Sequence, residues 1–178
     1  MSNSGEVLLQ AAQPNDAGLL ANLVQLYAYD LSEVYELSPG ADGRFAYDKL
    51  PLYWSDPDKR FPLLISHGGA LAGFALVTRG SPASDHPHVH DVAEFFVLRR
   101  HRRFGVGRQA AFLLWNRFPG TWTVRVSVGN TSALSFWSRA ITEYAGNTAT
   151  VSSRPNQPHD YKIYFFESTN HDRASANP

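Results

Sequence analysis

The sequence predicts a single α/β (α+β) domain in which short strands and amphipathic helices follow one another along the chain. The chain has 178 residues, which fits one domain, and its 43% hydrophobic and 13% aromatic content is enough to build a core. Strand-like apolar runs are separated by segments of helical period and by clusters of turn-forming residues. No internal repeat, low-complexity block or linker divides the sequence.

The first half of the chain predicts a strand, a helix and a hairpin. Residues 6–11 (EVLLQA) form an apolar strand, and Pro14-Asn15-Asp16 begins a helix whose apolar positions keep helical spacing. Apolar runs at 61–66 and 71–78 flank the turn His67-Gly68-Gly69-Ala70, which is typical of a β-hairpin. The two runs therefore predict a pair of antiparallel strands.

The second half predicts the remaining strands and two further helices. Residues 92–98 form a near-continuous apolar strand of the kind buried on both faces. A helix follows Gly107 and ends at Pro119-Gly120. The β-branched strand 121–128 precedes a helix that Asn130 caps and that runs to about Ala140. Two late strands are expected near 144–152 and at 161–167.

The segment 30–60 has no clean period and joins the first helix to the hairpin. It contains the aromatic residues Tyr35, Phe45, Tyr47, Tyr53 and Trp54. One interpretation makes them a substrate wall, because long connections inside compact domains are often functional. The other makes them aromatic residues that pack a loop onto the core. Acidic residues in the same segment suggest a cationic substrate or simply a solvated face.

Composition excludes several classes of site. Lys+Arg and Asp+Glu number 16 each, so no global field favours nucleic acid or an anionic membrane. The absence of cysteine excludes disulfides, thiolate zinc sites and a cysteine nucleophile. The start of the chain lacks the basic end and apolar run of a signal peptide, and no window is long and apolar enough for a membrane span. We therefore expect a cytoplasmic protein with no membrane partner.

The stretch RRHRRFGVGR, from Arg99 to Arg108, follows the apolar strand and opens a helix with Gly105 and Gly107. A helix N-terminus with glycines that let an anion approach the backbone is a predicted anion site. The spacing matches neither the P-loop nor the dinucleotide G-x-G-x-x-G, so those nucleotide sites are not indicated. A solvated basic turn and a nucleic-acid patch are the alternatives. We expect no nucleic-acid partner, because no further basic stripe or stacking motif accompanies the stretch.

Two stretches of the sequence read as motifs: Arg102, Gly105 and Gly107 in the basic stretch, and the residues from Asn130 to Trp137 (NTSALSFW). The first resembles the Arg/Gln-x-x-Gly-x-Gly/Ala motif of the GNAT superfamily of N-acetyltransferases, and the second is similar to its Asn-x-x-Ala-x-x-Phe/Leu-Tyr motif. The resemblance covers roughly residues 6–167, with its strong part at 92–137. It implies a GNAT-like mixed, mostly antiparallel central sheet flanked by helices.

The resemblance also implies a function and a domain assignment. Residues 1–168 would form the N-acetyltransferase domain, and 169–178 are predicted to be a disordered tail. Acetyl-CoA would be the cosubstrate, and a primary amine of a small molecule or peptide would attack it directly within a ternary complex. A non-catalytic acyl-CoA-binding or sensing module is the alternative. A homodimer is one oligomeric state that the sequence leaves open.

Cofactor binding is implied for the strand end, the glycine loop and the start of the next helix. The residues concerned are Phe96, Val97, Leu98, Arg102, Arg103, Phe104, Gly105, Val106, Gly107, Arg108, Asn130, Ala133, Phe136 and Trp137. Amides from Arg103 to Arg108 would bind the pyrophosphate, and a backbone N–H near Val97 or Leu98 would polarise the acetyl carbonyl. In the superfamily this strand is splayed by a bulge. Asn130 would both cap its helix and contact the cofactor.

The sequence offers several candidates for the general base and the general acid of the reaction. An alkyl amine with a pKa near about 10.4 must lose a proton, and Glu94 resembles a carboxylate that many family members carry. His86, His88 and His90 are the competing bases, and we expect no metal site among them. Trp137 replaces the tyrosine that protonates the leaving thiolate in many relatives, and an indole N–H is no such acid. Tyr144 would then supply the proton, or the thiolate leaves unaided, or nothing is transferred.

Overall fold

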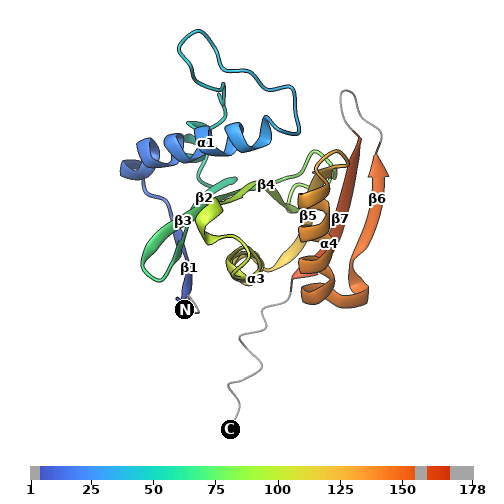
Figure 1. The fold of residues 1–178 in the computed structure, drawn as a ribbon. Helices are drawn as coiled ribbons and strands as arrows, with labels where there is room; N and C mark the ends of the chain where they lie inside the picture. Colours follow the sequence, from blue (N-terminus) through green and yellow to red (C-terminus); the bar gives the residue numbers. More distant parts are fainter. Residues whose placement is uncertain (1–4, 155–159, 169–178) are drawn as a thin grey trace.

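The computed structural model describes residues 5–154 and 160–168, and these residues form one twisted sheet with helices on both faces (Figure 1). The described part of the chain forms a seven-stranded sheet in the order β1-β2-β3-β4-β5-β7-β6. Only β4 and β5 pair in parallel, so the sheet is mixed and mostly antiparallel, as predicted. The elements are β1 Val7–Ala11, α1 Ala17–Leu31, α2 Leu52–Ser55, β2 Arg60–His67, β3 Ala70–Arg79, β4 His90–Val97, α3 Val106–Arg117, β5 Gly120–Ser127, α4 Thr131–Ala145, β6 Thr150–Arg154 and β7 Tyr161–Ser168.

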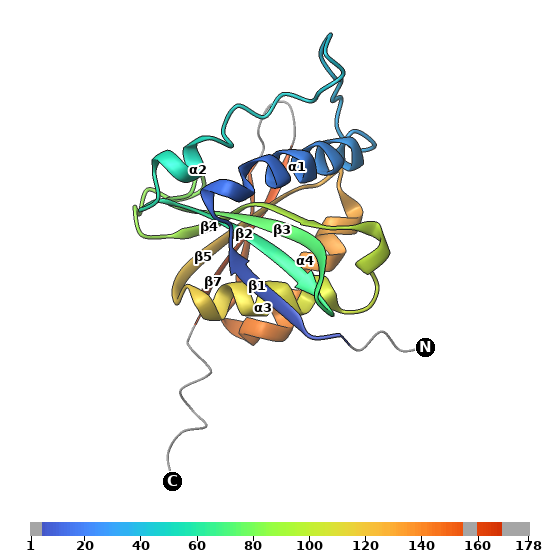
Figure 2. The same cartoon turned by 90° about the vertical axis from the view of Figure 1, so that its left-hand side faces the viewer.

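Two apolar layers hold the helices to the sheet. Helices α1 and α2 lie over one face, while α3 and α4 lie over the other (Figure 2). Leu20 and Val24 of α1 pack with Phe74 of β3 in the first layer. Trp115 of α3 and Ile141 of α4 belong to the larger second layer. Side chains that alternate along each strand reach both layers, which explains the near-continuous apolar character of the central strands.

Strands β4 and β5 pair only at their beginnings and then separate. The parallel register joins His90 to Trp122 and Asp91 to Thr123, and no further pair follows among the residues that the structure describes. On its other side β4 stays paired with β3 as far as Val97. The backbone groups of β4 that point toward β5 are therefore without a strand partner beyond Asp91.

A bulge in β4 accompanies this separation. Leu76 pairs with Glu94 whereas the next residue, Val77, pairs with Val92, so Ala93 is the extra residue of β4. The bulge places Glu94 and Phe96 toward α1, since Phe96 belongs to the layer under that helix. Phe95 points the other way and stacks on Phe136 of α4.

Some sequence expectations need correction. The strand expected near 144–152 is wrong in its first part, because α4 continues to Ala145 and β6 begins only at Thr150. The aromatic segment is not wholly irregular, since it includes α2, and Tyr53 is buried in the layer beneath α1. That burial favours the packing interpretation for Tyr53. The tail expected at 169–178 lies outside the described residues.

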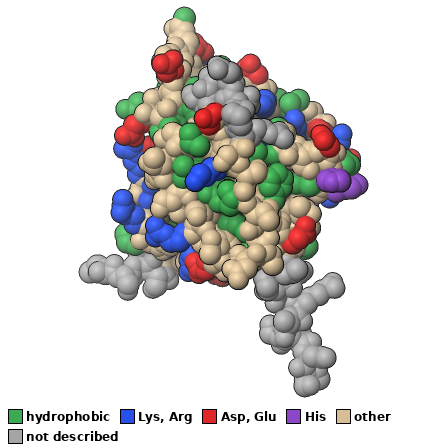
Figure 3. All heavy atoms as spheres, turned by 90° about the vertical axis from the view of Figure 1, so that its right-hand side faces the viewer, with side chains coloured by type: hydrophobic (Ala, Val, Ile, Leu, Met, Phe, Trp, Pro, Cys, Tyr) green, Lys and Arg blue, Asp and Glu red, His purple; other side chains and the backbone are tan. Residues whose placement is uncertain are grey.

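One face of the molecule shows where basic side chains gather on it. In the face shown in Figure 3, Lys and Arg side chains gather along one margin, and the rest of that face carries mixed side chains. This distribution fits a chain without net charge whose arginines are concentrated in a short stretch. None of the helices in the described residues has the length and apolar character needed to cross a membrane.

Candidate active site

A pocket of about 970 Å³ lies where β4 and β5 have separated, between α1, the start of α3 and the length of α4. That volume is at the upper end of the range typical for cofactor sites, about 300–1,000 Å³. Most of the residues predicted to bind a cofactor line this pocket: Phe96, Val97, Arg102, Arg103, Gly105, Gly107, Arg108, Asn130, Ala133, Phe136 and Trp137. Three predicted residues, Leu98, Phe104 and Val106, are not among the lining residues.

The loop before α3 presents a row of unpaired backbone amides. From Arg103 to Arg108 no N–H donates to an acceptor in the described part of the chain, and α3 has no side-chain cap. Gly105 has φ +75°, and Arg103, with φ +66°, is the one non-glycine residue of positive φ among the described residues. Such left-handed residues turn successive N–H groups toward a common point. The loop is therefore built to bind an anion at the positive end of α3.

Gly107 has a packing role that the sequence did not reveal. A Cβ at this position would lie 3.3 Å from ring atoms of Phe136, which is tighter than ordinary contact. The missing side chain thus lets α3 approach α4 closely, whether or not an anion is bound. A substitution at Gly107 would disturb helix packing as well as binding.

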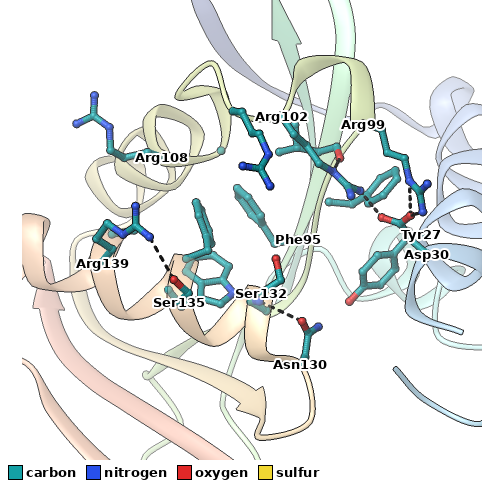
Figure 4. A pocket seen from close by; sticks show the side chains of 18 of the residues that line it. Tyr27, Asp30, Phe95, Arg99, Arg102, Arg108, Asn130, Ser132, Ser135 and Arg139 are labelled. Atoms are coloured by element: carbon teal, nitrogen blue, oxygen red, sulfur yellow. Dashed lines mark hydrogen bonds and ion pairs between the residues drawn. The ribbon is translucent and has the colours of Figure 1, made fainter. Parts of the chain in front are cut away.

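Arg102 and Arg99 are tied to α1 rather than free in the pocket. Arg99 donates twice to the Asp30 Oδ1, Arg102 donates to the Asp30 Oδ2, and the Arg102 Nε also donates to the Val97 carbonyl at 2.7 Å. Partial burial acts to raise the pKa of Asp30, but the hydrogen bonds from Arg102 and Arg99 outweigh it and hold that pKa below its ordinary value. Figure 4 shows this cluster at the α1 side of the pocket.

Arg108 and Arg139 supply the basic rim on the opposite side, and sequence reasoning missed Arg139. Arg108 forms an exposed ion pair with Glu143 of α4 at 2.6 Å, and Arg139 donates to Ser135 at 3.2 Å. Figure 4 shows both arginines projecting from α3 and α4 beside the loop. Ser135 and Arg139 are four residues apart, and this spacing could have suggested that they share a face of α4.

At the edge of β4 the structure distinguishes between the two predicted backbone amides. The N–H of Leu98 donates to the Ala72 carbonyl at 2.8 Å, so it is engaged with β3. Residues alternate along an antiparallel pair, which turns the N–H of Val97 away from β3 and toward the opening. Of the two, only the Val97 amide faces the pocket.

The start of α4 forms the wall opposite α1. The Asn130 Oδ1 accepts from the Ala133 N–H at 3.0 Å, so Asn130 caps α4 as predicted, and its side chain also lines the pocket. Trp137 is buried, and its ring meets Phe95 edge to face with centroids 5.0 Å apart. Trp137 therefore forms part of the pocket floor.

Glu94 lies beside the pocket but does not line it. Its Oε2 accepts from the Tyr27 hydroxyl at 2.7 Å and its Oε1 from the Tyr47 hydroxyl at 3.2 Å. Burial raises the pKa of the Glu94 carboxyl above its ordinary value, although the two phenol hydrogen bonds act to lower it. Tyr47 thus holds Glu94 without lining the pocket, and the substrate-wall interpretation of its segment stays a prediction.

The structure does not bring Tyr144 to this pocket. Its hydroxyl donates to Asn116 at 2.7 Å, and its ring packs on Trp115 at the far end of α4. Tyr144 follows Trp137 by seven residues, which is about 10 Å along a helix axis. We therefore withdraw Tyr144 as a candidate acid.

The histidines are also separated from Glu94. His86 and His88 are exposed in the loop before β4, whereas His90 is buried and packs against Trp122. Burial, followed by the charge of Arg79, lowers the pKa of His90. The described residues contain no grouping of His, Asp and Glu that could hold a metal ion. Glu94 is the remaining candidate base.

The chain matches a known protein family over most of its length. Residues 23–140 match the model of the acetyltransferase (GNAT) family. No curated protein matches the sequence.

Solved structures show the same fold. An acetyltransferase from Thermus thermophilus superposes with a TM-score of 0.67 at 17% identity, covering 92% of this chain and 98% of its own. A putative acetyltransferase from Salmonella typhimurium with its cofactor acetyl-CoA gives 0.64 at 12% identity, with 96% and 99% covered. Spermidine N-acetyltransferase from Vibrio cholerae, in complex with CoA and spermine, gives 0.64 at 11% identity, with 91% and 95% covered.

These observations define the class of protein as an acyltransferase with a pocket at a split sheet. The chain belongs to the acetyltransferase (GNAT) family. It is an acetyltransferase with acetyl-CoA as its cosubstrate, so the non-catalytic alternative is not retained.

Proposed function

We propose that this chain transfers the acetyl group of acetyl-CoA to a primary amine of a small molecule or peptide by direct attack in a ternary complex. One observation carries the proposal. The pocket joins an unpaired amide row at the start of α3 to a partly buried carboxylate, Glu94, through the hydroxyl of Tyr27. An acetyl transfer to an amine requires both an anion-binding end and a proton acceptor.

The residues present fit acetyl-CoA. The amides from Arg103 to Arg108 would hold the pyrophosphate, with Arg108 and Arg139 adding charge at the rim. The unpaired edge of β4 would hold the pantetheine arm, and the Val97 N–H would donate to the acetyl carbonyl. When bound, acetyl-CoA supplies an activated thioester as the acyl donor.

Glu94 would accept the proton of the attacking amine, directly or through water. A carboxylate of ordinary pKa is a weak base toward an ammonium with a pKa near about 10.4. Burial raises the pKa of Glu94, which improves its match to that task. Tyr27 and Tyr47 fix the position of the carboxylate without supplying a counter-charge.

Direct attack is supported by the side chains around the pocket. An acyl-enzyme needs a nucleophile activated by an adjacent base. The chain has no cysteine, and no histidine lines the pocket in the described residues. Ser135 accepts from Arg139, which is a donor only, and Ser132, which also lines the pocket, has no hydrogen bond to a base among the described residues. The amine itself is then the nucleophile.

An amine panel tests this function. Free thiol release with acetyl-CoA would be followed for small primary amines, polyamines and peptides with a free N-terminus, and each product identified by mass. We expect acetylation of at least one class and intersecting initial-velocity lines. Parallel lines would indicate an acyl-enzyme and refute direct attack. Absence of thiol release across the panel would refute the proposed acceptor class.

Cofactor binding is tested separately by charge removal at the two ends of α3. Arg108→Gln should weaken acetyl-CoA binding about tenfold, the loss of one charge-assisted contact. Arg117→Gln is the matched control, because Arg117 lies in the last turn of the same helix. Calorimetry measures both. Equal affinities in the two variants would contradict the proposal that Arg108 binds the cofactor at the rim of the pocket.

A further inference from the structure

The pocket contains few groups that could donate a proton. Asp30 is held by Arg99 and Arg102, and its pKa is lowered, while Glu143 is paired with Arg108. Glu33, the third acidic residue of the lining, is exposed. No histidine, lysine or cysteine lines the pocket in the described part of the chain. Trp137 has taken the place of the tyrosine expected from the family motif, and an indole is not an acid.

Tyr27 is the one tyrosine among the described lining residues. Its ring packs edge to face on Phe74 and obliquely on Phe96, with centroids 5.7 Å away in each case. Its hydroxyl donates to the Glu94 Oε2 at 2.7 Å, and burial, followed by the charge of Glu94, raises the pKa of Tyr27, so a proton lost from this phenol has to be replaced at once. Figure 4 shows Tyr27 reaching from α1 toward the wall that carries Asn130 and Ser132.

The two tyrosines on Glu94 are not equivalent. Tyr27 contacts both Glu94 and the pocket, whereas Tyr47 binds the other carboxylate oxygen and is absent from the lining. Arg125 of β5 and Lys49 are the charged groups that act on Glu94 besides these phenols. Among the described residues, the hydrogen bond from Tyr27 is the one that links Glu94 to a side chain of the pocket lining. A proton that moves along these hydrogen bonds from Glu94 to the pocket therefore passes through Tyr27.

We propose that Tyr27 is the catalytic acid that protonates the departing sulfur, and that Glu94 reprotonates Tyr27. The amine attacks as the neutral base, so that the C–N bond forms and the C–S bond breaks. The proton that the nitrogen then loses goes to Glu94 through water, the Tyr27 proton goes to the thiolate, and the Glu94 proton returns to the Tyr27 oxygen. The sum moves one proton from nitrogen to sulfur and leaves both residues as they began. This inference rests on the proposed function.

Tyr27→Phe tests the inference, with Tyr47→Phe as the matched control. Each variant removes one hydroxyl from Glu94 and keeps its ring, but only Tyr27→Phe removes a hydroxyl from the pocket. We expect Tyr27→Phe to lower kcat at least tenfold with little change in the KM for acetyl-CoA. Tyr47→Phe should have a clearly smaller effect on kcat.

A binding measurement gives a second readout that does not depend on turnover. Free coenzyme A and its desulfo analogue, which lacks the thiol, would be titrated at about pH 9, where much of a thiol is ionised. A hydroxyl that donates to the thiolate should favour coenzyme A about tenfold over the analogue. Tyr27→Phe should abolish this preference, and Tyr47→Phe should retain it.

Two results would overturn the relay. One is an unchanged preference for coenzyme A in Tyr27→Phe, and the other is an equal loss of kcat in both tyrosine variants, which would make Tyr27 a positioning residue for Glu94. Failure of the proposed function looks different, because the wild-type chain would then release no thiol with any amine of the panel. The two failures are therefore distinguishable.

Discussion

Asp91 and Glu94 are separated by two residues of β4, yet their surroundings differ completely. Asp91 is 0% exposed and lies where β4 still pairs with β5. Its carboxylate receives two hydrogen bonds from Arg125, at 3.0 and 2.8 Å, and one each from Ser81 and Thr123. Glu94 lies beyond the bulge, where the strands have separated, and two phenols but no cation bind it among the described residues.

The difference shows how one strand can carry two carboxylates in different electrostatic surroundings. A buried carboxylate that a cation and two hydroxyls bind holds these neighbours in place. A buried carboxylate held only by neutral donors has a raised pKa, because burial outweighs the hydrogen bonds. Asp91 therefore ties β4 to Arg125 of β5, whereas Glu94 suits the proposed role in proton transfer.

The largest expected effect is on turnover in Glu94→Gln. Loss of the proposed base should lower kcat about 10²- to 10⁴-fold, the usual range for a general base. Binding of acetyl-CoA should change little, because Glu94 does not line the pocket. Steady-state kinetics and calorimetry measure the two effects. If Glu94→Gln kept the wild-type kcat, Glu94 would take no more part in the reaction than Asp91 does.

Asp91→Asn should instead act on stability. Neutralising this side chain leaves the guanidinium of Arg125 without its buried partner, which typically costs about 3–5 kcal/mol in the free energy of unfolding. Urea unfolding measures the change, and the linear slope shows whether the transition stays cooperative. If Asp91→Asn unfolded at the wild-type urea concentration, the paired carboxylate would not be structural.

The pH dependence of stability should separate the two residues further. Because burial raises the pKa of folded Glu94, the folded state keeps a proton that the unfolded chain releases near the ordinary value of 4.5. The free energy of unfolding of the wild type should therefore fall relative to Glu94→Gln as pH rises from about 4.5 through the raised pKa. Urea unfolding of both proteins, repeated at increasing pH across this window, measures the difference. A difference that stays constant with pH would show that Glu94 is not perturbed.

Thr123→Val should give the smallest effect. It measures how much one hydrogen bond contributes to the cluster that Asp91 forms with Ser81, Thr123 and Arg125. The substitution is nearly isosteric and removes a hydroxyl 2.6 Å from the Asp91 Oδ1, at a cost of about 1 kcal/mol in stability. Kinetic constants should stay at the wild-type values, since Thr123 does not line the pocket. A large loss of kcat would show that the cluster also controls Glu94.

Much of the fold could be predicted because local patterns and short motifs determine it. The hairpin turn, the capping Asn130 and the stop at Pro119-Gly120 depend on neighbouring residues, and the structure confirms each of them. The error at the end of α4 arose because Tyr144 suits a strand by propensity. Its packing on Trp115 and its bond to Asn116 extend the helix instead.

The candidate site was predictable only where it follows a contiguous motif. The amides from Arg103 to Arg108 are consecutive, so the glycine pattern could predict an anion site there. Arg139 and Tyr27 carry no motif, and Tyr27 precedes Glu94 by 67 residues. No local pattern reports that a phenol of α1 will meet a carboxylate of β4.

The sequence by itself determined the order of the elements, the amide row at α3 and the family to which the chain belongs, because each is written in consecutive residues. The tertiary structure alone decided that Arg102 is bound to Asp30, that Tyr144 is remote and that Tyr27 links Glu94 to the pocket. The physical reason is that pairing, burial and the pKa of Glu94 depend on the separation of β4 from β5, which residues distant in the sequence produce together.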